Sequence, residues 1–262
     1  MELKSEKLKA FVEEIQTKNR NPRDNTAVLA LLKDKSSNPE LILSPRDELY
    51  RSRLLDERQA ISNDANFKGF NAKDSFVPPA DKTLDCRANY KYIPYLYCAN
   101  EPYTSVVEVR PRVGAKISVA TIRIKEDLKL LDFTMRHGCP ATLSEEKESL
   151  FEDLSELYSA PVTREDDTLT YIPTQYIAEY VKQLGYDGIA YKSALTPEVA
   201  AYRSISANLK DRYNVVVFNY EKCEAVNSRV VEVKYIHVEC SQEESENKLN
   251  FDGALSEILT EI

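Results

Sequence analysis

The sequence predicts an α+β protein, because stretches typical of strands and of helices are mixed without strict alternation. Two consecutive stretches, Lys116 to Ile124 and Leu128 to Phe133, read as strands separated by a short charged turn. Pro173 to Leu184 carries the apolar stripe of an amphipathic helix and is followed by a glycine. Two short apolar stretches after that helix, Gly188 to Tyr191 and Val215 to Phe218, read as further strands.

The first 48 residues are expected to form a helical extension. Residues 5–18 place apolar side chains on one helical face after a possible Ser5 cap. These side chains are Leu8, Phe11, Val12 and Ile15. A second short helix is expected from Thr26 to Lys35. Short amphipathic helices are marginal in isolation, so we expect the extension to pack on the core.

Residues 49–222 are expected to form the main domain. It opens with a strand from Leu49 to Leu55, in which alternation puts Arg51 and Arg53 on the same face. Residues 56–85 are polar and without clear periodicity, so they read as a long loop. Loops of that length are commonly functional or disordered.

The stretch from Pro94 to Arg110 holds one clear strand and one ambiguous segment. Pro94 to Ala99 is predicted to be a strand. Thr104 to Arg110 contains valines that favour a strand, whereas Ser105 and Glu108 have the spacing of a capping box that would open a short helix.

A second capping box, Thr142-Leu-Ser-Glu145, is expected to open a helix that aligns apolar side chains as far as Tyr158. Residues 223–262 are expected to add a strand from Val230 to Glu239 and an acidic tail from Cys240. A weak terminal helix is expected around Leu255 to Leu259.

Composition excludes several classes of protein. The chain has 35 basic and 43 acidic side chains, a net charge of −8, which argues against nucleic-acid binding. The N-terminus has no signal-peptide pattern, and the apolar runs are too short to span a bilayer, so no membrane partner is expected. Five cysteines without a Cys-x-x-Cys pair and only two histidines predict no disulfide framework and no metal site. A reducing cytoplasm fits this pattern.

Three polar residues stand at regular intervals in "RANYKYIPYLYCANEPYTSVVEVRPR": Arg87, Tyr97 and Glu108, spaced by 10 and 11 residues. This stretch resembles the RES domain family, which shows an Arg-x-Asn block, a Leu-Tyr-hydrophobic-Ala strand and then Thr-Ala-x-x-Glu. One departure is that Ser105-Val106-Val107 replaces the family's small residue between Thr and Glu.

The second half of the resemblance is "YIPTQYIAEYVKQLGYDGIAYKS", a helix followed by Asp-Gly-hydrophobic and a serine, which is Ser193. Because the segment after Ser193 is longer than in compact members, Ser204 and Ser206 are rival candidates. "LYRSR" is similar to the family's opening strand, whose arginine faces the pocket and corresponds to Arg51. The resemblance covers roughly residues 49–220.

The resemblance implies an ADP-ribosyltransferase-like core of mixed β-sheets flanked by helices. It also implies cleavage of the nicotinamide–ribose bond of NAD, which would be a substrate and not a cofactor, with water or phosphate as acceptor. Many members are NAD-degrading toxins, and those with partners are usually paired with an antitoxin that plugs the active-site cleft. Transfer of ADP-ribose to a protein is the nearby variant.

This chemistry suits the residues present. Cleavage passes through an oxocarbenium-like state, and Glu108 is expected to stabilise the ribosyl cation and hold the ribose hydroxyls. Arg51 and Arg87 suit bidentate binding of the pyrophosphate, with Arg53 as a weaker candidate. Tyr97 is expected to stack on the nicotinamide or bond the ribose, and Ser193 to donate a hydrogen bond to the amide or a phosphate.

Taken singly, each of these residues has an ordinary explanation. An arginine beside a strand is usually a solvated charge, Tyr97 alone would be core packing, and Glu108 alone a capping residue. Their joint order and spacing favours the enzymatic interpretation. A module that holds NAD, ADP-ribose or a partner protein without turnover is the alternative of a different class.

Overall fold

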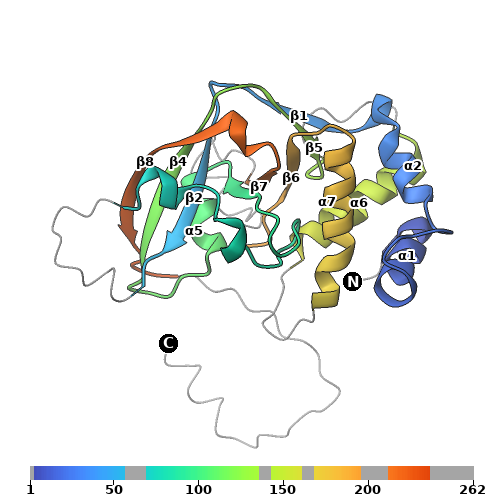
Figure 1. Ribbon diagram of the computed structural model, residues 1–262, viewed down its shortest axis with the longest axis horizontal. Helices are drawn as coiled ribbons and strands as arrows, with labels where there is room; N and C mark the ends of the chain where they lie inside the picture. Colours follow the sequence, from blue (N-terminus) through green and yellow to red (C-terminus); the bar gives the residue numbers. More distant parts are fainter. Residues whose placement is uncertain (1–2, 57–68, 136–142, 161–167, 196–211, 237–262) are drawn as a thin grey trace, which may run out of the picture.

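The computed structural model describes residues 3–56, 69–135, 143–160, 168–195 and 212–236. Its centre is an eight-stranded sheet in the order β1-β5-β6-β7-β3-β2-β4-β8 (Figure 1). The strands are β1 (Glu40–Leu43), β2 (Glu48–Leu54), β3 (Leu96–Ala99), β4 (Lys116–Ile124), β5 (Leu128–Asp132), β6 (Gly188–Lys192), β7 (Tyr213–Val217) and β8 (Cys223–Glu232). Helices flank this mixed sheet, so the α+β prediction is confirmed.

The pairing of β5 with β6 is parallel, whereas the other strand pairs of the sheet are antiparallel. Parallel neighbours need a long crossover connection. Here α6 (Glu145–Ser159) and α7 (Ile172–Gln183) supply it, with the 3-10 turn η4 (Thr168–Tyr171) leading into α7. The left-handed Gly185 follows α7, as the sequence predicts for a helix stop.

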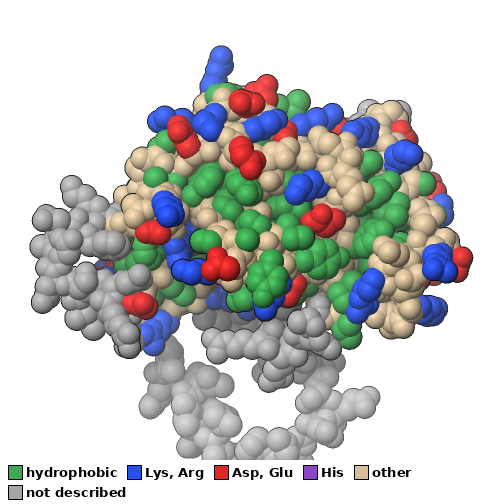
Figure 2. All heavy atoms as spheres, in the orientation of Figure 1, with side chains coloured by type: hydrophobic (Ala, Val, Ile, Leu, Met, Phe, Trp, Pro, Cys, Tyr) green, Lys and Arg blue, Asp and Glu red, His purple; other side chains and the backbone are tan. Residues whose placement is uncertain are grey.

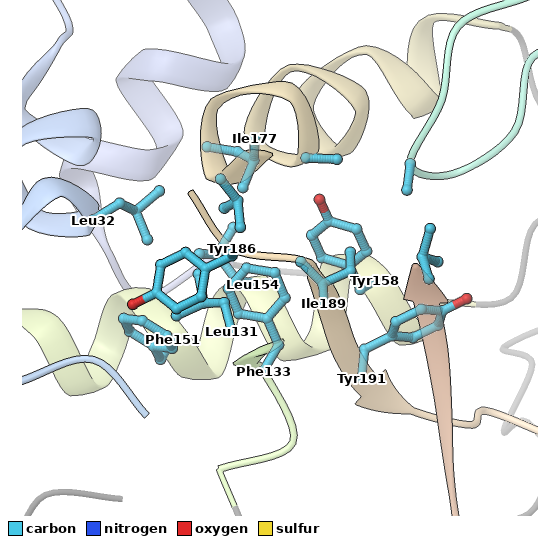
Figure 3. Packing of buried hydrophobic residues seen from close by; sticks show 14 of the residues in the cluster. Leu32, Leu131, Phe133, Phe151, Leu154, Tyr158, Ile177, Tyr186, Ile189 and Tyr191 are labelled. Atoms are coloured by element: carbon cyan, nitrogen blue, oxygen red, sulfur yellow. The ribbon is translucent and has the colours of Figure 1, made fainter. Parts of the chain in front are cut away.

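Four of the helices gather at one end of the sheet. Figure 1 shows α6 and α7 beside β5 and β6, with α1 (Glu6–Glu13) and α2 (Ala27–Lys33) outside them, whereas β2, β4 and β8 lie at the other end. One face of the sheet packs on these helices through a cluster rich in aromatic rings, part of which Figure 3 shows. The other face carries a second, mainly aliphatic cluster.

The N-terminal helices share the first of these two clusters, as expected. Leu8, Phe11 and Ile15 are fully buried, together with Val28 and Leu32 of α2. Ser5 caps α1 by accepting a hydrogen bond from the Leu8 amide, which confirms the predicted cap. After α1 the chain continues as a π-helical turn, Glu14–Lys18, and the 3-10 turn Lys35–Ser37 follows α2. The predicted extension also contains β1, which the sequence analysis missed.

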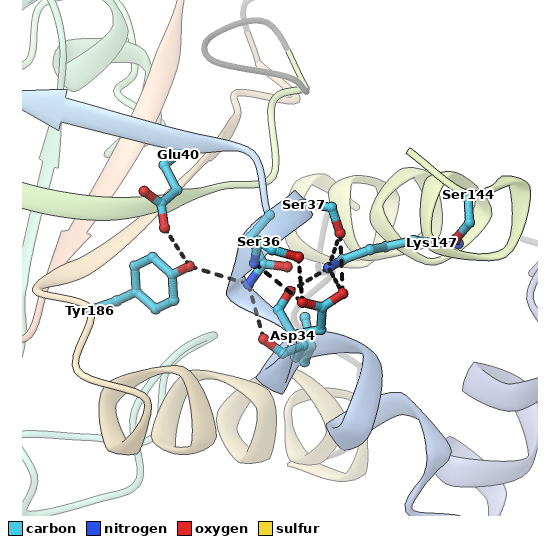
Figure 4. Close-up of polar contacts among 9 residues, drawn as sticks. Asp34, Ser36, Ser37, Glu40, Ser144, Lys147 and Tyr186 are labelled. Carbon is cyan, nitrogen blue, oxygen red and sulfur yellow. Dashed lines mark hydrogen bonds and ion pairs between the residues drawn. The ribbon is translucent and has the colours of Figure 1, made fainter. Parts of the chain in front are cut away.

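A buried lysine fastens this extension to α6 (Figure 4). Lys147 is 2% exposed, and its ammonium donates to the Asp34 carbonyl at 2.5 Å and to Ser37 Oγ at 2.7 Å. Burial lowers the pKa of this ammonium, while the Asp34 carboxylate opposes that effect. Nearby, the Tyr186 hydroxyl donates to Glu40 at 2.8 Å. Buried polar groups need such partners, so these contacts hold residues 34–40 in a defined position.

Two predicted helix caps need correction. The ambiguous segment forms a helix, α5 (Pro102–Glu108), but Glu101 is its N-cap and not Ser105, because Pro102 at the first position already has the required backbone angle. The N-cap of α6 is Ser144, which accepts from the Lys147 amide, and Thr142 lies outside the described residues.

The last predicted strand begins too late, because β8 starts at Cys223 and pairs along the whole of β4. The loop predicted for residues 56–85 contains two short helical turns within its described part, α4 (Ala72–Ser75) and η3 (Ala80–Lys82). Another turn, η6 (Tyr220–Lys222), leads into β8. The predicted terminal helix lies outside the described residues.

Gly188, the first residue of β6, lies where no side chain fits. A Cβ added there would stand 2.3 Å from the Val216 carbonyl oxygen and 2.9 Å from a Leu130 methyl group. Gly188→Ala therefore must push β6 away from β7. We expect a loss of about 1–3 kcal/mol in the free energy of unfolding, as for other overpacked sites. Urea denaturation measures it, and an unchanged midpoint would contradict this packing.

Surface and composition features agree with a mixed-charge protein. On the face drawn in Figure 2, Lys and Arg side chains are interspersed with Asp and Glu.

Within the described ranges, no helix is long and apolar enough to cross a membrane. Within the same ranges, no group of three or more His, Cys, Asp or Glu is arranged to hold a metal ion. Both histidines, His137 and His237, lie outside them.

Candidate active site

Glu108 is placed by α5, which a pair of serines fastens to the sheet. Ser105 Oγ lies 2.7 Å from Ser52 Oγ of β2, and both hydroxyls are buried. Ser105 also donates to the Pro102 carbonyl at 2.8 Å. Glu108 is the last residue of α5, where the helix dipole disfavours a negative charge. Its carboxylate therefore needs other groups to stabilise it.

Two side chains from the sheet hold the Glu108 carboxylate. Ser193, directly after β6, donates from Oγ to Glu108 Oε1 at 2.6 Å. Asn214 of β7 donates from Nδ2 to the same oxygen at 2.7 Å. Ser193 is 6% exposed and Asn214 5%, so both donors have fixed surroundings. Among the residues that the structure describes, Oε2 has no hydrogen-bond partner, which leaves one carboxylate oxygen available to a ligand.

Tyr97 pairs with Val216 across β3 and β7, so their side chains share one face of the sheet. Asn214 lies two residues before Val216 in the same strand and therefore points to that face as well. The Tyr97 hydroxyl donates to Asn89 Oδ1 at 2.7 Å and accepts from the Ala88 amide at 3.0 Å. Burial raises the pKa of Tyr97 well above its usual value, so the phenol stays protonated. Tyr97 thus fastens the loop before β3, which carries Arg87.

A glutamine from α7 fastens the same loop from the other side. The Gln175 amide nitrogen donates to the Asn89 carbonyl at 2.9 Å and to the Cys86 carbonyl at 3.0 Å. Gln175 is 3% exposed and Asn89 1%. The Asn89 side chain in turn donates to two loop carbonyls, those of Leu84 and Tyr90. The backbone on both sides of Arg87 is therefore held by buried hydrogen bonds.

The Arg87 guanidinium caps the C-terminus of α6. It donates through one nitrogen to the Tyr158 carbonyl and to the Leu157 carbonyl at 3.4 Å, and through the other to the Ala160 carbonyl at 2.6 Å. The last carbonyls of a helix lack partners within the helix and carry partial negative charge, so a guanidinium suits them. No direct hydrogen bond joins Arg87 to Glu108 within the described ranges.

Tyr191 lies next to residues that hold Glu108 and Arg87. It pairs directly with Asn214 across β6 and β7, and its ring centroid lies 5.6 Å from that of Tyr158, whose carbonyl accepts from Arg87. Burial raises the pKa of Tyr191; the Arg87 charge opposes this rise and the Glu108 charge adds to it. The phenol is therefore neutral near pH 7 and lies within the electrostatic reach of both charged side chains.

Arg51 and Arg53 lie on the other face of the sheet. Tyr50 pairs with Ala99, which lies on the same face as Tyr97 because the two residues are two apart in β3. Arg51 is next to Tyr50 in β2, so its side chain points to the opposite face. Arg51 is half-buried and donates to the Ser75 carbonyl at 3.3 Å; burial lowers the pKa of its guanidinium. Arg53 is exposed, stacks 4.5 Å from the Phe70 ring and bonds the Asp74 carbonyl. The structure does not bring these two arginines together with Glu108, and their role in binding stays a prediction.

The structure thus bonds Ser193 to Glu108 and Tyr97 to the loop that carries Arg87, and Tyr191 lies within electrostatic reach of Arg87, Tyr97 and Glu108. Sequence reasoning missed Tyr191, Asn214 and Gln175. Asn214 had a signal of its own, since it is a polar residue within the buried run Tyr213–Val217. The rival serines, Ser204 and Ser206, lie outside the described residues.

Comparison with known proteins supports the resemblance noted from the sequence. No curated protein matches the chain. A solved structure that does match is the crystal structure of the M. tuberculosis MbcT–MbcA toxin–antitoxin complex, with 16% identity and a TM-score of 0.43, over 78% of this chain and 92% of that one. The RES domain model matches residues 65–240, a range that begins after Arg51 and Arg53 and contains the other predicted site residues. Since this match spans more than half of the sequence, the chain belongs to the RES domain family.

Proposed function

We propose that this chain cleaves the nicotinamide–ribose bond of NAD and transfers the ADP-ribosyl group to water or phosphate. The observation that carries this proposal is the Glu108 carboxylate, whose Oε1 accepts from Ser193 and Asn214 while Oε2 stays available. A carboxylate oriented through one oxygen presents the other at a fixed position. Such a preorganised charge is what a cationic transition state requires.

The proposed reaction needs little proton transfer. The nicotinamide nitrogen is already cationic in NAD, so the bonding electrons leave with it and no acid has to protonate the leaving group. Positive charge develops on the ribose, and Glu108 stabilises it, as a carboxylate does in glycoside hydrolysis. Water then bonds to the ribosyl carbon and releases a proton, giving ADP-ribose; phosphate as acceptor gives the 1″-phosphate.

The neighbouring residues have supporting parts in this proposal. Ser193 orients the carboxylate instead of contacting the amide or a phosphate, because its hydroxyl proton is directed at Glu108. Arg87 keeps N–H donors beyond those that bond α6, and these are suited to a phosphate oxygen. The Tyr97 ring is held in a fixed position, since its hydroxyl both accepts from and donates to residues of the loop that carries Arg87.

The direct test is to incubate the purified protein with NAD, with and without phosphate, and to measure nicotinamide and the ADP-ribose product by chromatography. Free ADP-ribose or its phosphate ester is the expected product. Labelled ADP-ribose on a macromolecule would instead indicate protein ADP-ribosylation. NAD that binds and stays intact would indicate a binding module, and no nicotinamide under either condition would refute the proposal.

We further propose that this activity makes the chain a toxin whose activity a partner protein blocks. Membership of the RES domain family supports this proposal. Controlled expression should lower cellular NAD and arrest growth. The same expression of Glu108→Gln should do neither, and growth arrest by that variant would show that toxicity does not come from NAD cleavage.

Asn214→Asp tests the electrostatics of the carboxylate. This change puts a second carboxyl group against Glu108, where the amide nitrogen now lies 2.7 Å from Oε1. Two carboxyl groups that share a site do not both ionise easily, so the apparent pKa of the pair rises. Because the proposed mechanism needs ionised Glu108, the acidic limb of the pH–kcat profile should move to higher pH, and activity should recover as the pH is raised.

A matched control is Asn21→Asp, which makes the same charge change on an exposed loop of the N-terminal extension. Its pH–kcat profile should follow that of the unaltered protein. An unshifted profile for Asn214→Asp would mean that Glu108 does not act as a carboxylate in the reaction.

A further inference from the structure

The Tyr191 hydroxyl is an exception among the buried tyrosines of the aromatic cluster. Tyr158 donates to the Thr174 carbonyl at 2.5 Å, Tyr186 to Glu40 at 2.8 Å, and Tyr97 to Asn89 at 2.7 Å. Tyr191 is 8% exposed, yet its hydroxyl has no hydrogen-bond partner among the residues that the structure describes. In the described ranges its oxygen is not among the fully buried side-chain atoms that lack a partner, so it reaches the surface, where a ligand can bond it.

The position of this hydroxyl suggests what its partner is. Figure 3 shows the Tyr191 ring at the edge of the cluster, with its oxygen directed away from Phe133 and the other packed rings. Across the sheet Tyr191 pairs with Asn214, which holds Glu108. On its other side it packs 5.6 Å from Tyr158, whose carbonyl holds Arg87. Tyr191 therefore borders both the residue that holds the carboxylate and the residue that holds the guanidinium.

We propose that the Tyr191 hydroxyl donates a hydrogen bond to a ribose or phosphate oxygen of the bound nucleotide, between the groups that Glu108 and Arg87 contact. This inference rests on the proposed NAD-cleaving function and adds a substrate-binding residue to it. The hydroxyl fits this part because it stays protonated near pH 7, and the packing around its ring fixes its direction. Phenylalanine would fill the same packing volume without supplying the donor.

The test separates binding from stability. NAD affinity is measured by calorimetry in the Glu108→Gln background, where turnover is suppressed, with and without Tyr191→Phe. We expect the Kd to rise about tenfold, the loss of one hydrogen bond to a ligand. The Tm should stay unchanged or rise, because the removed hydroxyl has no partner in the described part of the protein. ADP-ribose should show the same loss of affinity, since it retains the oxygens concerned.

Tyr186→Phe is the matched control, because it removes a hydroxyl that bonds Glu40 and Asn38 far along the sheet from Glu108. It should lower the Tm and leave the Kd unchanged. If Tyr191→Phe instead lowers the Tm and keeps the Kd, Tyr191 is merely structural and the inference is overturned.

The two proposals fail in different ways. If the unaltered protein binds NAD without releasing nicotinamide, the enzymatic proposal fails, while the Kd of Tyr191→Phe still decides the inference. If neither NAD nor ADP-ribose binds at millimolar concentration, both proposals are overturned.

Discussion

Glu108→Gln should reduce the kcat for nicotinamide release by about 10²–10³-fold, the usual effect of removing one preorganised electrostatic group from an active site. The glutamine carbonyl oxygen still accepts from Ser193 and Asn214, so the side chain keeps its position. The other oxygen is replaced by an NH2 group, so the negative charge that stabilises the ribosyl cation is lost. The change in KM should be small by comparison, and steady-state kinetics measures both quantities.

Glu224→Gln provides the control for this substitution. Glu224 forms an exposed ion pair with Arg123 at 3.3 Å on β8, where the loss of one charge has little effect on stability. Its kcat should equal that of the unaltered protein. Full activity of Glu108→Gln with an unchanged fold would show that the charge of Glu108 does not take part in the chemistry.

Arg87→Lys should affect both stability and binding. A lysine ammonium is a single point charge on a flexible stem, so it does not reproduce the planar contacts with the carbonyls of Leu157, Tyr158 and Ala160. We expect the free energy of unfolding to fall by about 2 kcal/mol, because hydrogen bonds from a charged donor contribute about 1.5–3 kcal/mol each and lysine retains part of this sum. For a domain of this size the loss corresponds to a fall of roughly 4–8 °C in Tm.

The same substitution should raise the Kd for NAD in the Glu108→Gln background, because lysine lacks the two parallel N–H donors with which a guanidinium binds a phosphate. Arg46→Lys is the control, since Arg46 is exposed on the turn between β1 and β2. It should leave both Tm and Kd unchanged. If Arg87→Lys lowers the Tm but not the affinity for NAD, Arg87 only caps α6.

Much of the local structure was predictable because it depends on neighbours in sequence. The stripe of α7, the stop at Gly185 and the bounds of β4 follow from side-chain periodicity and backbone preference. The start of β8 was missed, because its residues after the buried Cys223 are exposed or only partly buried and show no strong apolar pattern. The α5 N-cap was misplaced because Ser105 bonds Ser52 from a distant strand, a contact that local spacing does not reveal.

The sequence by itself determined the family and named candidates for the site, because Arg87, Tyr97, Glu108 and Ser193 stand at characteristic positions within strand and helix patterns. Only the tertiary structure decided which of them meet. Strand register puts Tyr191 beside Asn214 and sends Arg51 to the opposite face, and helix docking brings Arg87 to the end of α6. Register and docking depend on contacts between residues far apart in the chain, so no local pattern contains them.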